Sequence, residues 1–257
     1  MSVLRVVALG WWLHLKMRSR SAFDGVLQLL WPLFFGTTVF LLFQAGSMDE
    51  TTMLSAAIGA GVMGVWSATS TTAAFALSQE RSQGTLELLV ASPSPLTAVI
   101  LPITLSMATI GAYSLGATML WGWLAFDIDV TIADPVTFAV AVVATVIGVG
   151  MLGFILALST VRYRAAWALG AALELPVWLV CGLLVPLSEL PGWVHPISWL
   201  LAPTWGMEAL RSAALGREAA PALAACFGLA AAYGAIGVLL SGHLLRSARI
   251  HASLALR

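Results

Sequence analysis

The sequence predicts an all-α polytopic membrane protein, with six transmembrane helices in one membrane domain over residues 1–257. Of its residues, 60% are hydrophobic and only 9% are charged, whereas soluble domains are about half apolar and about a quarter charged. Six spans of about 20 residues each fit within this length. Outside those spans, no segment is long enough for a soluble catalytic domain.

Composition also excludes several function classes. The formal net charge is zero, so no nucleic-acid partner is expected. Both cysteines, Cys181 and Cys226, lie in apolar runs and indicate neither a disulfide framework nor a zinc site. A phosphate-binding Walker loop needs a lysine after its glycine. The one lysine, Lys16, follows Leu15, so we expect no ATP hydrolysis and no cofactor in this chain itself.

Residues 1–24 are expected to form an amphipathic helix in the cytoplasmic interface of the membrane. Apolar and basic residues separate onto two faces, with Leu4, Val7, Trp11 and Leu15 on one and Arg5, Lys16 and Arg20 on the other. Basic residues beside tryptophans are typical of helices that lie at the level of the lipid headgroups.

Six apolar segments follow, and the basic residues between them predict their orientation. The spans are expected at about 26–46, 53–77, 98–126, 136–160, 166–188 and 221–244. With the N-terminus inside, ten of the twelve basic residues face the cytoplasm, and only Arg211 and Arg217 lie outside. Cytoplasmic loops are enriched in such residues, so both termini are predicted to be cytoplasmic.

The second span combines small residues with a hydroxyl cluster. Ala56, Ala60, Gly64 and Ala68 repeat every fourth residue, a pattern that lets another helix approach closely. The cytoplasmic half of the span carries Ser67, Thr69, Ser70, Thr71 and Thr72. These hydroxyls either bond to carbonyls of their own or a neighbouring helix, or form a polar wall of a translocation pathway.

The fifth span contains Glu174, the one acidic residue deep in an apolar run, two residues before Pro176. An ionised carboxylate there costs a few kcal/mol, so it must be neutral, paired or facing water. Either it bonds to backbone groups freed by the proline, or it faces a central pathway or a partner subunit.

The outer segment between spans five and six, residues 187–212, is expected to form short helices that enter the outer leaflet and return. Pro191, Pro196 and Pro203 interrupt it, and Trp193, Trp199 and Trp205 are typical of interfacial anchors. His195 has no metal-ligating neighbours in the sequence, which favours a structural role.

The loop at residues 78–95 is the most polar on the inner side, yet it has helical spacing. Leu86, Leu89 and Val90 share one face, and Glu80, Gly84 and Glu87 share another. An amphipathic helix between two spans either docks on a partner or lies on the inner headgroups. Prolines at positions 93 and 95 end it.

Two motifs resemble those of the ABC type-2 exporter permeases, a family of drug, polysaccharide and lipid exporters. The first is Glu80-Arg81-Ser82-Gln83-Gly84-Thr85-Leu86-Glu87-Leu88-Leu89, followed by Ser92-Pro93. The second runs from Pro203-Thr204 to Glu208-Ala209-Leu210-Arg211 at the end of the outer segment. The N-terminal helix, the six spans and the inside termini also agree with this family.

The resemblance implies a permease subunit without catalytic residues. Two cytosolic ATPase subunits, which bind ATP and magnesium, would drive two paired permease chains in a bacterial inner membrane. The substrate would be a drug, a lipid or a similar amphipathic molecule. A coupling helix in the 78–95 loop would contact the ATPase through Glu80, Arg81, Gly84, Thr85, Leu86 and Glu87.

The same resemblance implies a translocation pathway along spans two and five. Its candidate residues are Ser67, Ser70, Thr71, Glu174 and Trp178. Pro203, Glu208 and Arg211 would belong to a gate formed by the re-entrant outer helices. The alternative is an ion-driven carrier or channel without an ATPase, although such proteins usually bury several ionisable residues. A membrane enzyme ranks third, because the scattered histidines and the isolated Glu174 form no catalytic constellation.

Overall fold

The computed structural model describes residues 3–19, 22–45, 50–82, 95–162 and 167–251, and these are helical almost throughout. No strand occurs within these ranges. The helices, in chain order, are α1 (Val3–Ser19), α2 (Ala22–Ala45), α3 (Glu50–Ser82), α5 (Thr97–Gly111), α6 (Tyr113–Phe126), α7 (Pro135–Arg162), α8 (Trp167–Ala172), α9 (Glu174–Val180), the 3-10 helix η2 (Leu187–Glu189), α10 (His195–Trp199), α11 (Ala202–Ala214) and α12 (Ala220–His251).

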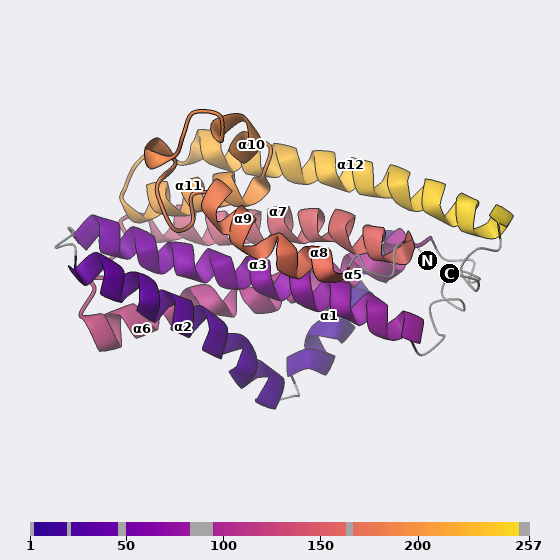
Figure 1. Cartoon of the computed structure of the whole chain (residues 1–257), viewed down its shortest axis with the longest axis horizontal. Coiled ribbons are helices and arrows are strands. Elements are labelled where there is room, and N and C mark those ends of the chain that lie inside the picture. The colour runs from indigo at the N-terminus through magenta and orange to yellow at the C-terminus, as the bar shows by residue number, and fades with distance from the viewer. Residues whose placement is uncertain (1–2, 20–21, 46–49, 83–94, 163–166, 252–257) are drawn as a thin grey trace.

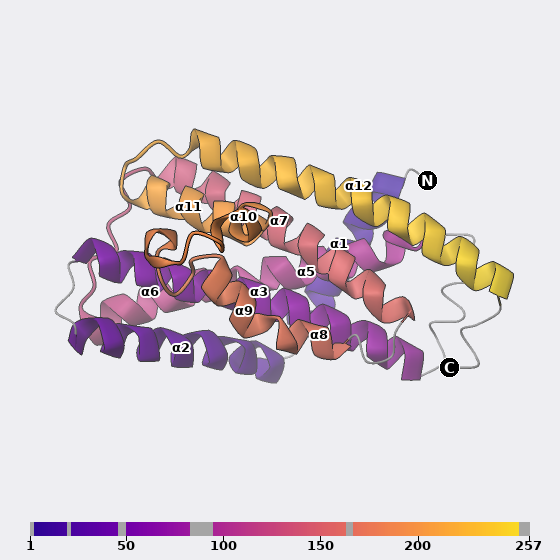
Figure 2. The same cartoon turned by 45° about the horizontal axis from the view of Figure 1, so that its top comes forward.

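The long helices form one elongated bundle with two distinct ends (Figures 1 and 2). The C-terminal ends of α3, α7 and α12 lie at one end of the bundle, on the right of Figure 1. At the other end lie α11 and the connection between α6 and α7. This connection is tied to the end of α11, because the backbone N–H groups of Ala133 and Asp134 donate to the carbonyls of Ala214 and Ala213.

Four helical stretches in the described residues are long and apolar enough to cross a membrane. They are Thr51–Thr71, Thr97–Phe126, Pro135–Ser159 and Ala220–Leu244. Two further apolar helical stretches, Pro32–Leu42 and Gly170–Val180, coincide with the expected first and fifth spans but are shorter. The chain is therefore an all-helical, multi-pass membrane protein.

The expected fifth span differs most from a continuous helix. Where the sequence predicts one span over 166–188, two short helices, α8 and α9, meet at Leu173. Pro176 explains the break, because it has no N–H to donate to the carbonyl of Ala172 and its ring displaces that carbonyl. Helix α9 then ends at Val180, and the chain turns at Gly182 with a φ of 70°.

Helix α3 occupies the centre of the bundle, and its small residues are in close contact with other helices. Ala56, Ala60, Gly64 and Ala68 are all buried. A Cβ atom at Gly64 would lie 2.4 Å from the Cβ of Ser114 on α6 and 2.7 Å from Pro32 on α2. The close approach predicted from the small-residue repeat is confirmed at this position.

The hydroxyl groups of α6 reinforce that contact. The Ser114 hydroxyl lies 2.6 Å from the carbonyl of Gly61 on α3 and 2.5 Å from that of Gly111. The Thr118 hydroxyl lies 3.1 Å from the carbonyl of Ala57 on α3 and 2.9 Å from that of Ser114. In a bilayer, where water does not compete, such inter-helix hydrogen bonds hold helices together.

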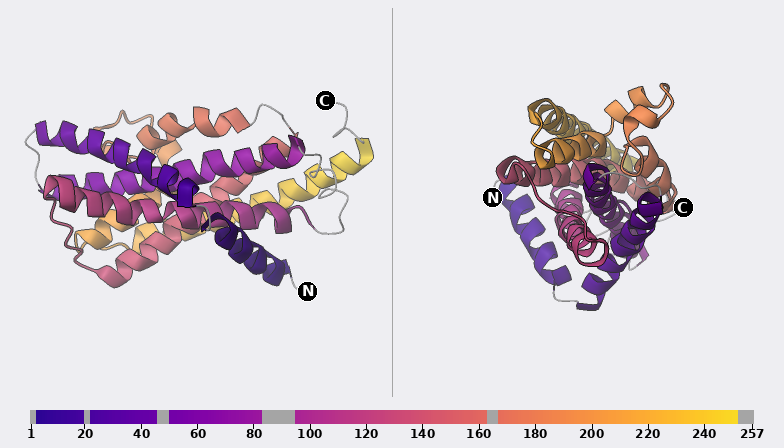
Figure 3. Two further views of the ribbon diagram at one scale, coloured as in Figure 1. Left: turned by 90° about the horizontal axis from the view of Figure 1, so that it is seen from below. Right: turned by 90° about the vertical axis from the view of Figure 1, so that its left-hand side faces the viewer.

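Helix α1 lies obliquely outside the bundle (Figure 3). Its Trp11 indole Nε1 donates to the Thr109 hydroxyl at 3.1 Å, and Gly10 lies against Pro102 of α5. Val7, Trp11 and Leu15, from the predicted apolar face, are partly buried, whereas Trp12, Leu13 and Met17 are exposed. Some apolar side chains of α1 therefore pack against the bundle, and others point away from it.

Candidate functional site

The predicted coupling segment is described only at its start. Helix α3 continues through Glu80 and Arg81 to Ser82, five residues beyond the predicted end of the second span at 77. Gly84, Thr85, Leu86 and Glu87 lie outside the described residues. The described start of the segment lies at the same end of the bundle as the C-terminal ends of α7 and α12 (Figure 1).

The hydroxyl groups of α3 fall into two groups. Thr69 donates to the carbonyl of Val65 at 2.7 Å, and Thr71 donates to that of Ser67 at 2.5 Å. Thr69 and Thr71 thus bond to carbonyls of their own helix, which is the first of the two alternatives given for these hydroxyls. Ser70 is different, because its side chain is 2% exposed and its oxygen has no hydrogen-bond partner among the described residues.

Helices α8 and α9 lie along this polar part of α3 (Figures 1 and 2). Gly170 permits the contact, because a Cβ atom there would lie 2.5 Å from the carbonyl oxygen of Ser70. Two turns further, the Trp178 ring packs edge-on against Phe35, with 4.7 Å between the ring centroids. Glu174 lies between them at a spacing of four residues from each, and it is half-buried. The structure thus places α8 against α3 at Ser70 and packs Trp178 of α9 against Phe35 of α2.

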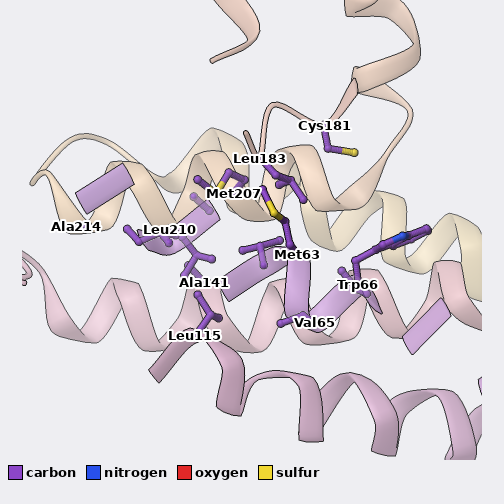
Figure 4. Packing of buried hydrophobic residues seen from close by; sticks show 14 of the residues in the cluster. Met63, Val65, Trp66, Leu115, Ala141, Cys181, Leu183, Met207, Leu210 and Ala214 are labelled. Carbon is purple, nitrogen blue, oxygen red and sulfur yellow. The ribbon is translucent and has the colours of Figure 1, made fainter. Parts of the chain in front are cut away.

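The turn after α9 contacts both α3 and the outer segment. Leu183 lies beside Met63 of α3 and Met207 of α11 in one apolar cluster (Figure 4). The Arg211 side chain donates from Nη2 to the carbonyl of Gly182 at 3.0 Å. Its guanidinium therefore binds the turn that immediately follows the helix carrying Glu174 and Trp178.

Hydrogen bonds from side chains to backbone carbonyls hold the outer segment. Ser198 bonds to the carbonyl of Val180 at 2.6 Å, and the His195 ring contacts that of Leu187 at 3.0 Å. Tyr233 of α12 donates to the carbonyl of Leu200. His195 thus has a structural partner, as the sequence predicts. No group of three or more potential metal-ligating residues is found within the part of the chain that the structure describes.

The three residues predicted for the outer gate share one helix but differ in exposure. Pro203 is buried in the first turn of α11, where its missing N–H is tolerated. Glu208 is exposed, and its carboxylate lies 3.5 Å from the hydroxyl of Ser212. Of these three residues, only Arg211 is seen to bond to a residue outside α11, the carbonyl of Gly182.

Sequence reasoning did not identify Trp66, Gly59 or Gly170. Trp66 is 1% exposed, and its indole N–H has no partner among the described residues. The small-residue repeat of α3 could have drawn attention to Gly59, which lies one position before Ala60. Nothing in the sequence marks the contact between Gly170 and Ser70.

The bundle and its long apolar helices define a multi-pass integral membrane protein. The family model for ABC-2 type transporters matches residues 5–215. The chain therefore belongs to the ABC-2 type transporter family, whose members are the membrane components of ABC transporters and work with ABC ATPase subunits. No curated protein matches the chain in sequence.

Proposed function

We propose that the chain is the permease subunit of an ABC exporter. With a second permease chain, identical or homologous, it forms an alternating-access pathway for an amphipathic substrate such as a drug or a lipid. ATP hydrolysis on two separate cytosolic ATPase subunits drives the cycle. The observation that carries this proposal is the ABC-2 match over residues 5–215, together with the Gly-Thr-Leu-Glu motif at residues 84–87.

The proposed topology has six spans, with both termini in the cytoplasm of a bacterial inner membrane. The shared location of the ends of α3, α7 and α12 supports it (Figure 1). These helices carry Arg81, Arg162 and Arg246 at that end. Arg211 and Arg217 lie near the opposite end, and such an asymmetry is typical of a cytoplasmic and an outer side. Helix α2 and the α8–α9 pair supply the first and fifth spans.

Coupling is proposed to run from the 78–95 segment into α3. Glu80, Arg81, Gly84, Thr85, Leu86 and Glu87 contact the ATPase, with Glu80 and Glu87 paired to its basic groups. Because α3 is continuous from Glu50 to Ser82, a displacement of its inner end is transmitted along its whole length. ATP binding then shifts the helices between two arrangements that differ in their contacts.

The pathway is proposed to follow α3 and α8–α9, with Ser67, Ser70, Thr71, Glu174 and Trp178 as its polar and aromatic residues. Support comes from the half-buried carboxylate of Glu174 in an apolar helix, since intramembrane ionisable groups commonly serve function. Pro203, Glu208 and Arg211 belong to the outer gate in this proposal. Arg211 supports that role through its bond to Gly182.

Affinity purification of the tagged chain in mild detergent tests the proposed function directly. We expect a stoichiometric partner of ATPase size that carries its own phosphate-binding loop. A second permease band, or its absence, distinguishes a heterodimer from a homodimer. Purification of the chain alone, under conditions that preserve other such complexes, would contradict the proposal and favour an ion-driven carrier.

A further inference from the structure

The exposed face of α1 combines cationic and apolar side chains. Arg5, Leu9, Trp12 and Lys16 are all exposed. At 3.6 residues per turn, these four positions fall within about 60° of one another around the helix. Leu9 and Trp12 therefore lie between the two cations along one line of α1. This face carries no carboxylate, because the first acidic residue of the chain is Asp24.

The other face of α1 is held by the bundle, which fixes the direction of the exposed face. The Trp11 indole Nε1 donates to Thr109 Oγ1 at 3.1 Å. A Cβ atom at Gly10 would lie 3.0 Å from the side chain of Pro102. Both partners belong to α5. Part of the apolar face that the sequence predicts for the membrane thus contacts protein, and a second face, cationic and apolar, points outward from the bundle (Figure 3).

Helix α1 meets the bundle close to the level at which the apolar part of α3 ends. The contacts of α3 with α5 and α6 run antiparallel, and a Cβ atom at Gly111 would lie 2.8 Å from the Cα of Val65. Counting back along α5 and forward along α3 from this contact, Thr104 is close to level with Thr71, where the apolar stretch of α3 ends. The two α5 residues that contact α1 lie on either side of Thr104. The exposed face of α1 is therefore at the boundary between acyl chains and headgroups.

We infer that this face of α1 binds the phosphate groups of anionic phospholipids in the cytoplasmic leaflet. Arg5 and Lys16 are eleven residues apart, or about 16 Å along a helix, so each contacts the phosphate of a different lipid. Guanidinium and ammonium groups form charge-assisted hydrogen bonds with phosphate. Trp12 lies between them at the level that tryptophan favours in membranes. This inference rests on the proposed function, whose topology places this end of the bundle in the cytoplasm.

The charges on the face favour an anionic lipid over other occupants. In a zwitterionic lipid, the ammonium group of the headgroup competes with Arg5 and Lys16 for the phosphate, whereas in an anionic lipid it is absent. A second α1 from another copy of the chain would bring only further cations to this face, because residues 1–23 contain no Asp or Glu. Anionic lipids give the cytoplasmic leaflet a negative surface potential that attracts basic segments.

Photolabelling of the full chain, together with any ATPase that co-purifies, tests this lipid class. The protein is reconstituted in nanodiscs of phosphatidylcholine and phosphatidylglycerol, in which one of the two lipids carries a diazirine beside its headgroup. Labelled peptides from residues 3–19 are quantified by mass spectrometry. We expect stronger labelling by the phosphatidylglycerol probe, and a preference that falls as the salt concentration rises. Equal labelling by both probes, or no labelling of α1 by either, would overturn the inference.

Charge variants identify the contacts. Arg5→Gln and Lys16→Gln each remove one cation from an exposed position, where the fold is unaffected. Each should lower the ratio of anionic to zwitterionic labelling by about fivefold, the effect of one basic residue near an anionic surface. The matched control is Arg246→Gln, which removes one exposed cation from α12 at the same end of the bundle and should leave the ratio unchanged. An unchanged ratio in both α1 variants would refute Arg5 and Lys16 as the lipid contacts.

The outcomes separate this inference from the function on which it rests. Purification of the chain without an ATPase would refute the proposed function and leave the labelling ratio in nanodiscs intact. Equal labelling by the two lipid probes, with the ATPase bound, would refute the lipid inference alone. The leaflet is tested with Met17→Cys and a membrane-impermeant thiol reagent, since Met17 is exposed and both native cysteines are buried. Reaction from the cytoplasmic side is expected, and reaction from the outer side alone would overturn the leaflet assignment.

Discussion

The backbone carbonyl of Leu183 lies directly against Gly59, so that a Cβ atom at Gly59 would be 2.1 Å from its oxygen. The same Cβ atom would be 3.3 Å from the terminal carbon of Met207. A single glycine of α3 thus accommodates both the turn after α9 and the outer helix α11.

Gly59→Ala is predicted to destabilise the folded chain. A contact of 2.1 Å with a backbone oxygen cannot be relieved by a side-chain rotation, so the turn at Gly182–Leu183 must shift. Overpacking of this kind costs about 1–3 kcal/mol. Thermal unfolding in mild detergent measures the effect. Gly228→Ala on α12 is the control, because no atom lies within 4 Å of the added Cβ, and an alanine there favours the helix. Equal stability of the two variants would contradict the packing described.

Removal of the α6 hydroxyls is predicted to loosen the contact between α3 and α6. Ser114→Ala deletes the donor to the Gly61 carbonyl, and Thr118→Val deletes the donor to that of Ala57. Hydrogen bonds between membrane helices contribute about 0.6 kcal/mol on average and up to about 1.7 kcal/mol. The double variant should therefore unfold at a lower temperature than either single one. Thr38→Val, whose exposed hydroxyl bonds within α2, should be neutral.

Arg211→Met is predicted to free the turn at Gly182 from α11. A hydrogen bond from a charged group contributes about 1.5–3 kcal/mol to the stability of the fold. Its loss should accelerate amide hydrogen exchange in residues 182–201 before other regions are affected. Arg211→Lys should restore part of the protection, since an ammonium can still donate to one carbonyl. Arg217→Met at an exposed position is the control. Exchange that is unchanged in Arg211→Met would mean that the bond to Gly182 does not hold the turn.

Hydrophobic length and local patterns sufficed to predict most helices. The expected spans at 53–77, 98–126, 136–160 and 221–244 overlap the four stretches that are long and apolar enough to cross a membrane. The Ala56–Ala68 repeat predicted a close helix contact because small residues at a spacing of four always lie on one face of a helix. The motif at residues 80–89 identified the family, which the match over residues 5–215 supports.

Contacts between distant residues could not be predicted in the same way. Pro176 gave a local reason for a break near Ala172, but its apolar surroundings favoured a continuous span over 166–188. The partners of Ser70 and Gly59, which are Gly170 and Leu183, lie 100 and more residues away in the chain. Without the fold, Trp66 is indistinguishable from any tryptophan of the apolar core. Its unpaired N–H becomes visible only when its neighbours are placed.

Glu174→Gln is predicted to change transport and to leave the fold intact. An amide keeps the size of the side chain and removes the ionisable carboxyl group from a half-buried position in an apolar helix. The free energy of unfolding should therefore stay the same or rise by at most about 0.5 kcal/mol. Transport by proteoliposomes that contain the complete complex is the measurement, with Glu189→Gln in the exposed outer segment as the control. Normal transport in Glu174→Gln would remove this carboxylate from the proposed pathway.

Glu80→Ala and Glu87→Ala are predicted to uncouple ATP hydrolysis from transport. If the two carboxylates pair with basic groups on the ATPase, their loss weakens the transmission of nucleotide binding into α3 more than it weakens assembly. A charged pair at an interface contributes about 1.5 kcal/mol or more, so each variant should lower the transport rate per ATP hydrolysed by about tenfold or more. The ATPase should still co-purify, because the rest of the interface remains.

Glu218→Ala is the matched control, since Glu218 is exposed between α11 and α12 at the opposite end of the bundle. An unchanged ratio of transport to hydrolysis in both variants would place the docking face elsewhere, because a coupling contact must affect that ratio even where it contributes little to assembly.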